Sequence, residues 1–196
     1  MSLTDEICAA AARLVVDEGM EYGPAKRKAA RVLGRHGVRS AEMPGNEQLE
    51  EEVRRHIALF HADTQPAELA ALRSIARDWM RRMHAFRPHL SGAVWRGTAT
   101  RHNDVHLQLY CDDSKEAEIA LINLGVPYEV GETSGPRGET AMVLAVCAPS
   151  PALGEAVTVQ MTVLDHDDMR GALKPDAQGR SWRGDLAALD RLMVAA

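Results

Sequence analysis

The sequence predicts an α+β protein in which a helical N-terminal region packs on a small mixed β-sheet. Up to Pro88, hydrophobic residues recur every three or four positions, which is the period of an amphipathic helix. Afterwards several segments alternate polar and apolar residues, which is the period of a strand. The 196 residues, 45% of them hydrophobic, suffice for one core with a helical extension. We expect a helical, basic region over residues 1–65 and an α/β domain over residues 66–196.

The first three helices are predicted from residues that favour helix ends. Thr4 begins a helix that stops at Gly19. A short helix opens at Gly23-Pro24, because proline's missing N–H costs nothing in a first turn, and it ends at Gly34. Asn46 caps a third helix. The apolar stripe of this third helix consists of Leu49, Val53, Ile57 and Phe60.

The fourth predicted helix has the clearest periodicity. It begins at Thr64-Gln65-Pro66 and ends before Pro88. Its apolar positions are Leu69, Leu72, Ile75, Trp79, Met83 and Phe86. Arg73, Arg77 and Arg81 follow a neighbouring line, which we interpret as the solvent-exposed side; a phosphate-binding groove is the alternative.

After Pro88 the pattern favours strands. The predicted strands cover residues 91–96, 104–110, 127–130, 141–148 and 156–163. Glycine and proline in residues 131–138 predict a loop there. Asp112, Asp113 or Ser114 caps one helix, which closes at Gly125, and Asp185 caps a last helix.

Charge is distributed unevenly along the chain. The net charge is −5, but residues 1–101 carry 16 basic and 13 acidic side chains, whereas residues 102–196 carry 7 and 15. No acidic residue interrupts the stretch from Tyr22 to Ser40, whose basic residues are Lys26, Arg27, Lys28, Arg31, Arg35 and Arg39. Such a cluster can contact RNA, another nucleic acid or an acidic protein partner, although an ordinary charged surface has the same pattern.

The cysteines and the N-terminus favour a cytoplasmic protein. Cys8, Cys111 and Cys147 are odd in number and far apart, which argues against a disulfide framework. Asp5 and Glu6 lie where a signal peptide would carry positive charge, and no apolar run is long enough to span a membrane.

One segment has the order of a phosphoryl-transfer site. Gly97-Thr98 forms a predicted turn after a strand, and Asp104 opens the next strand six residues after Thr98. Residues i and i+2 on a strand face the same side, so a strand that begins Asp-x-Asp supplies two carboxylates to one site. Two divalent ions held by such carboxylates stabilise the attacking and leaving oxygens of a phosphoryl transfer.

With these residues, positions 66–165 resemble the nucleotidyltransferase superfamily, which includes DNA polymerase β and the antibiotic nucleotidyltransferases. In that family a Gly-Gly or Gly-Ser pair closes one strand, Asp-x-Asp or Asp-x-Glu follows on the next, and a third acid lies on a later strand. The resemblance implies that Arg96, Gly97 and Thr98 bind a nucleotide and that Asp104 holds a metal ion. Mg²⁺ or Mn²⁺ is the cofactor expected for such a site.

The chain departs from this pattern at two of the three acidic positions. His106 occupies the second carboxylate position, and the polar residues of the later strand are Thr158, Gln160 and Thr162. We therefore expect a pseudoenzyme that binds a nucleotide or RNA. Two alternatives stay open: an active metal-dependent nucleotidyltransferase using Asp104 with His106 as ligand or general base, and a regulatory protein that binds partners through the basic helix.

A second metal site is an alternative for the same strand. If the strand begins at His102, then His102, Asp104 and His106 project from one side and provide two imidazoles and a carboxylate, which suit zinc. The competing interpretation is that His102 lies in the turn and His106 lies on a solvated sheet face.

Overall fold

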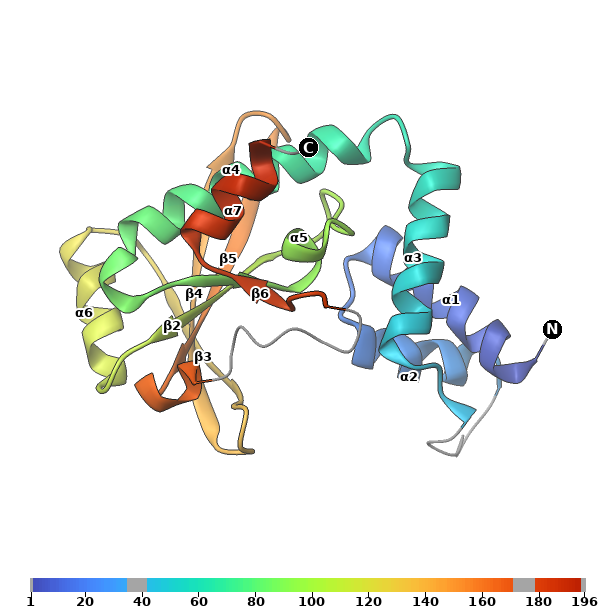
Figure 1. Cartoon of the computed structure of the whole chain (residues 1–196), viewed down its shortest axis with the longest axis horizontal. Coiled ribbons are helices and arrows are strands. Elements are labelled where there is room, and N and C mark those ends of the chain that lie inside the picture. The colour runs from blue at the N-terminus through green and yellow to red at the C-terminus, as the bar shows by residue number, and fades with distance from the viewer. Residues whose placement is uncertain (1, 35–41, 171–178, 195–196) are drawn as a thin grey trace. The chain divides into compact units, whose positions relative to one another are not determined.

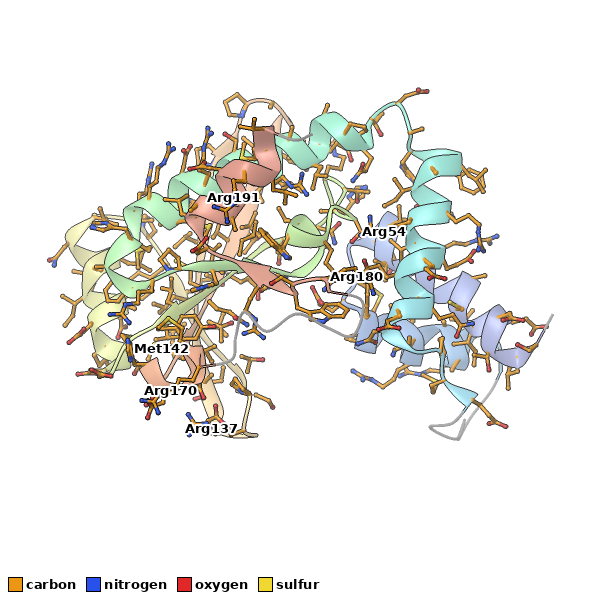
Figure 2. The ribbon with its side chains drawn as sticks, viewed as in Figure 1. Arg54, Arg137, Met142, Arg170, Arg180 and Arg191 are labelled. Carbon is orange, nitrogen blue, oxygen red and sulfur yellow. The ribbon has the colours of Figure 1, made fainter. Side chains whose placement is uncertain are left out.

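A computed structural model describes residues 2–34, 42–170 and 179–194. It confirms the α+β class, with helices and a six-stranded mixed sheet (Figure 1). The chain divides into two compact units. The first unit comprises Met1–Leu69 and Thr98–Asn103, and the second comprises Ala70–Gly97 and Asp104–Ala196. No helix within the described residues has the length and apolar character needed to cross a bilayer.

Three helices form the first unit. They are α1 (Leu3–Glu18), α2 (Tyr22–Val32) and α3 (Asn46–Phe60). The cap of α1 is Ser2 rather than the predicted Thr4, because Ser2 and Asp5 bond each other's backbone N–H in a capping box. Gly19 ends α1 as predicted, with a left-handed φ of 66°.

The three helices share a core of their own. Its buried side chains come from all three helices: Ile7, Cys8, Ala11, Ala12, Val15, Val16, Tyr22, Ala25, Ala29, Ala30, Leu49, Val53 and Ile57. Phe60, predicted to extend the apolar stripe of α3, is instead 67% exposed. The small alanines of α1 and α2 let the helix backbones approach closely.

Residues 98–103 connect to this helical unit through hydrogen bonds. The Thr100 hydroxyl donates to the Val16 carbonyl at 2.9 Å, and the Asn103 amide donates to the Gly19 carbonyl at 3.4 Å. The Gln65 amide donates to the Ala99 carbonyl at 2.9 Å. Two of these bonds satisfy carbonyls in the last turn and cap of α1, which lack partners within the helix.

The second unit is built on one sheet with the strand order β3-β4-β5-β2-β1-β6. The strands are β1 (His89–Ser91), β2 (Val105–Tyr110), β3 (Glu129–Ser134), β4 (Thr140–Ser150), β5 (Glu155–Leu164) and β6 (Arg183–Gly184). Only the β2–β5 pair is parallel; the other neighbours are antiparallel.

The remaining helices lie around this sheet. They are α4 (Gln65–Arg82), whose first residues belong to the first unit, α5 (Gly92–Arg96), α6 (Ser114–Asn123) and α7 (Leu186–Val194), with 3-10 turns η2 (His84–Phe86) and η3 (His166–Met169). Met80 of α4 and Leu186 of α7 line one cavity. The caps of α6 and α7 are Asp113 and Asp185, as predicted.

Three local predictions were wrong. Residues 92–96 form helix α5 instead of a strand, because Gly92 has a φ of 72° that a strand does not accommodate. Residues 131–134 continue β3 instead of forming a loop, since they pair with β4. Arg73 is only 7% exposed rather than solvated, and its guanidinium donates to the carbonyls of Val94 and Trp95 in α5. Burial lowers the pKa of Arg73.

Candidate functional site

The sheet of the second unit has one apolar face and one polar face. Along β2 and β5, alternate side chains are fully buried: Val105, Leu107, Leu109, Val159, Met161 and Val163. The residues between them are half-buried and polar. The register pairs His106 with Gln160 and Gln108 with Thr162, while Ser91 pairs with both His106 and Arg183. We define the polar sheet face by Ser91, His106, Gln108, Thr158, Gln160, Thr162 and Arg183.

Asp104 lies directly before β2, beside this polar sheet face. Its carboxylate accepts a hydrogen bond of 2.6 Å from the Gln160 amide on the neighbouring strand β5. Asp104 is therefore in direct contact with Gln160, a polar residue of the later strand on which a third acid is expected. One carboxylate facing one amide gives a weak site for Mg²⁺, which prefers several hard oxygen ligands.

His106 lies on the same face as Gln160. Its ring packs beside Gly92, where a Cβ would meet the His106 ring at 3.4 Å. The Ser91 hydroxyl donates to the His106 carbonyl at 3.4 Å. A glycine at position 92 therefore provides room for the imidazole as well as the left-handed turn into α5.

The structure agrees with the competing interpretation, in which His102 lies in the turn and not on a strand with Asp104 and His106. Strand β2 begins at Val105, and His102 is an exposed residue of the preceding turn. The three side chains would share one side only if the strand started at His102. Because β2 starts at Val105, this alignment does not occur.

The residues expected to bind a nucleotide have internal contacts. Gly97 ends α5 with a φ of 79°, so it closes a helix and not a strand. Thr98 is fully buried, and its hydroxyl has no hydrogen-bond partner among the described residues. The Arg96 guanidinium lies over the Trp182 ring, 5.7 Å from its centroid. Of these three residues only Thr98 is fully buried, whereas Arg96 and Gly97 are half-buried.

Arg183 adds a cation to the polar sheet face that the sequence analysis missed. Its Nη1 donates to the Gln108 side chain at 2.6 Å and to the Tyr110 hydroxyl at 3.4 Å. The Tyr110 hydroxyl in turn donates to Gln108 at 3.0 Å, and burial raises the pKa of Tyr110. The Arg183 Nε–H is buried without an acceptor among the described residues. A two-residue strand has no periodicity, so no sequence signal marks Arg183.

A cavity of about 420 Å³ lies near the end of β1. It is lined by Met80, His84, Arg87, Pro88, His89, Met169, Asp185, Leu186 and Ala187. His89 also packs edge-on against Tyr110, with ring centroids 5.3 Å apart. The cavity is within the size range of small-molecule sites, and His89 connects it to the Tyr110–Gln108–Arg183 network.

Two lysines of the basic helix α2 make contacts within the first unit. The Lys26 ammonium donates to the Pro44 carbonyl at 3.1 Å and to the Asn46 side chain at 2.8 Å, where it holds the start of α3. Lys28 pairs with Glu18 at 2.5 Å. Arg27 and Arg31 are exposed, and the predicted Arg35 and Arg39 lie outside the described residues. Among the described basic residues of α2, Lys28 is thus paired with an acid, and Lys26 stabilises the start of α3 through neutral acceptors.

The first unit contains a group of metal-ligating side chains that the sequence analysis also missed. Ligand atoms of Asp17, His56 and His61 lie within 4.8 Å of one another. Asp17 and His56 are 39 residues apart, and no short motif connects them. Only the packing of α1 against α3 brings them together.

Comparison with known proteins gives no family assignment. Neither a family model nor a curated protein sequence matches this chain. The function has to be argued from the residues and their geometry.

Proposed function

We propose that the second unit is a nucleotidyltransferase-like domain that binds a nucleoside triphosphate on its polar sheet face without carrying out nucleotidyl transfer. The observation that carries the proposal is the contact between Asp104, directly before β2, and Gln160 on the neighbouring parallel strand β5. The resemblance described above expects an acidic residue at position 104 and another on this later strand. An amide on the later strand leaves a polar site with a single carboxylate.

Charge and hydrogen-bond capacity favour a phosphate-containing ligand. Arg183 places a guanidinium on this face, and phosphate oxygens are suitable acceptors for guanidinium N–H groups. Asp104 repels a bare triphosphate, so a Mg²⁺ or Mn²⁺ ion carried by the nucleotide would bridge the two. His106 and Gln108 offer further polar contacts on the same face.

Catalysis is disfavoured by the same ligand set. Phosphoryl transfer with two metal ions needs clustered carboxylates to hold both ions. His106 and Gln160 supply an imidazole and an amide in their place.

A cytosolic protein, which the spacing of the three cysteines favours, would meet nucleotides at high concentration.

The test is a thermal-shift and calorimetry series on the full chain with each of the four ribonucleoside triphosphates. Each nucleotide is measured with Mg²⁺, with Mn²⁺ and with chelator, and short single-stranded RNA is measured in parallel. At about 100 times Kd, a ligand stabilises the folded protein by about 2.7 kcal/mol, which gives a clear rise in Tm.

Two variants locate the site. Asp104→Asn is expected to weaken metal-dependent nucleotide binding by about tenfold or more, equal to about 1.4 kcal/mol, and to leave metal-free binding no weaker. Asp112→Asn, which removes an exposed carboxylate beyond the other end of β2, is the matched control and should bind as the parent does. No shift with any nucleotide at millimolar concentration would disprove the proposal, and pyrophosphate release would disprove its non-catalytic part.

A further inference from the structure

Asp17, His56 and His61 belong to elements that are held firmly in the first unit. Asp17 lies in the last turn of α1, His56 lies on α3, and His61 is the C-cap of α3. Their neighbours Val16 and Ile57 are buried in the shared core, at 0% and 8% exposure. The backbone positions that present the three side chains are therefore fixed by packing.

Two of the three separations between the ligand atoms fit a tetrahedral metal ion. The Nε2 atoms of His56 and His61 lie 3.7 Å and 3.4 Å from the same oxygen, Asp17 Oδ1. Zinc binds imidazole nitrogen and carboxylate oxygen at about 2.0–2.2 Å, so two ligands of a tetrahedral ion are about 3.3–3.5 Å apart. The two separations from Asp17 match this ligand spacing to within a few tenths of an ångström, and the two imidazole nitrogens lie within 4.8 Å of each other.

Direct hydrogen bonding describes the group less well. A charge-assisted bond from an imidazole N–H to a carboxylate is about 2.7–2.9 Å long. Both imidazoles stay farther than this from the carboxylate, although each points its Nε2 toward it. The spacing leaves room for a small cation between the three side chains.

Orientation and access also suit an ion. The His56 ring packs against Phe60, with centroids 4.7 Å apart, and the His56 and His61 rings are 5.9 Å apart. The His56 side chain is 14% exposed, whereas Asp17 is 53% exposed. The exposed Asp17 carboxylate gives an ion access from solvent, while the His56 ring is held by its contact with Phe60.

We propose that Asp17, His56 and His61 bind a divalent transition-metal ion of the zinc type. Two imidazoles and one carboxylate match the ligand preferences of Zn²⁺ and Co²⁺ and not those of Mg²⁺ or Ca²⁺, which take oxygen ligands. Three protein ligands leave a fourth position for water or for another molecule. The ion would link the end of α1 to the end of α3. This site is independent of the nucleotide site, since all three ligands are in the first unit.

The experiment uses the full chain, freed of metal with a chelator and titrated with Co²⁺. Tetrahedral cobalt gives intense visible absorption bands, and competition with Zn²⁺ then measures zinc affinity. We expect one equivalent of metal per chain and a rise in Tm with Zn²⁺. The exposed thiol of Cys147 could bind zinc outside the proposed site, so every protein in the series carries Cys147→Ser.

The variants are His61→Ala, Asp17→Asn and the double change His56→Ala/His61→Ala. Each single change should weaken zinc binding by at least about tenfold. Replacing residues that only support a ligand already lowers metal affinity by about 10–100-fold, so removing a ligand should cost no less. His84→Ala, which removes an exposed histidine in the second unit, is the control and should leave affinity unchanged. Circular dichroism in chelator checks that the variants fold. Zinc binding by the double variant with the parent's affinity, or no binding by the parent at micromolar zinc, would overturn the proposal.

Discussion

Replacing Gly19 with alanine should destabilise the first unit more than the same change at a comparable glycine. Gly19 has a φ of 66°, and a Cβ built there would lie 2.0 Å from the His102 carbonyl oxygen. Gly34 has a φ of 70°, but a Cβ there would meet no atom of the described residues within 4 Å. Both changes force a left-handed conformation on alanine, whereas only Gly19→Ala pushes against the backbone of residues 98–103. The pair therefore separates conformational strain from displacement of that segment.

The structure allows the two costs to be estimated. A left-handed conformation costs a non-glycine residue about 1–2 kcal/mol, which is the full cost expected for Gly34→Ala. At position 19 the segment must also move away, which breaks the bonds from Thr100 to Val16 and from Asn103 to Gly19. Each bond contributes about 0.5–1.5 kcal/mol, so Gly19→Ala should cost about 2–5 kcal/mol in total.

Urea titrations followed by far-ultraviolet circular dichroism measure the difference. Tryptophan fluorescence provides a second signal, because Trp79, Trp95 and Trp182 all belong to the second unit. Gly19→Ala should lower the midpoint of the helical transition well below that of Gly34→Ala. Equal midpoints for the two variants would refute the reasoning, since the contact between residues 98–103 and α1 would then contribute nothing to stability.

Two further outcomes follow from burial. Arg73→Met keeps the aliphatic stem but leaves the Val94 and Trp95 carbonyls without their charged donor, so unfolding experiments should show a loss of about 1.5–3 kcal/mol; Arg81→Met, at an exposed position, should change stability by less than about 0.5 kcal/mol. Burial raises the pKa of Cys8 and Cys111 to about 11, so at about pH 8 iodoacetamide should modify the exposed Cys147 and spare the other two until the protein is denatured. Mass spectrometry that finds all three modified at one rate would contradict this expectation.

Local signals explain which helices were predictable. Gly19, Asp113 and Asp185 end or begin helices through their own backbone and side-chain chemistry, and each is found at the expected place. Helix α5 is only five residues long, too short for a period of 3.6 to be recognised. Gly131 favours a loop, so the sequence predicts a strand that ends at residue 130. The pairing of β3 with β4 extends the strand to Ser134, and this contact between separate segments is not visible in the local sequence.

The candidate sites divide in the same way. Asp104 and the polar residue Gln160 follow from strand periodicity, and their direct contact depends on the parallel pairing of β2 with β5. Arg73 could not be distinguished from its exposed neighbours, because its burial is decided by the carbonyls of α5. The same holds for Asp17 and His61, which become neighbours only when α1 and α3 pack together.

The polarity of one sheet face is the feature that most needs a functional explanation. Strands favour β-branched and aromatic residues, and a half-buried amide or guanidinium must find partners or destabilise the fold. Gln108, Gln160 and Arg183 meet this requirement through specific bonds to Tyr110, Asp104 and one another. Even so, the Arg183 Nε–H has no acceptor within the described residues. The guanidinium remains a cation on this face, and a phosphate offers oxygen acceptors with complementary charge. The nucleotide proposal thus accounts for a cation on the sheet that stability alone does not require.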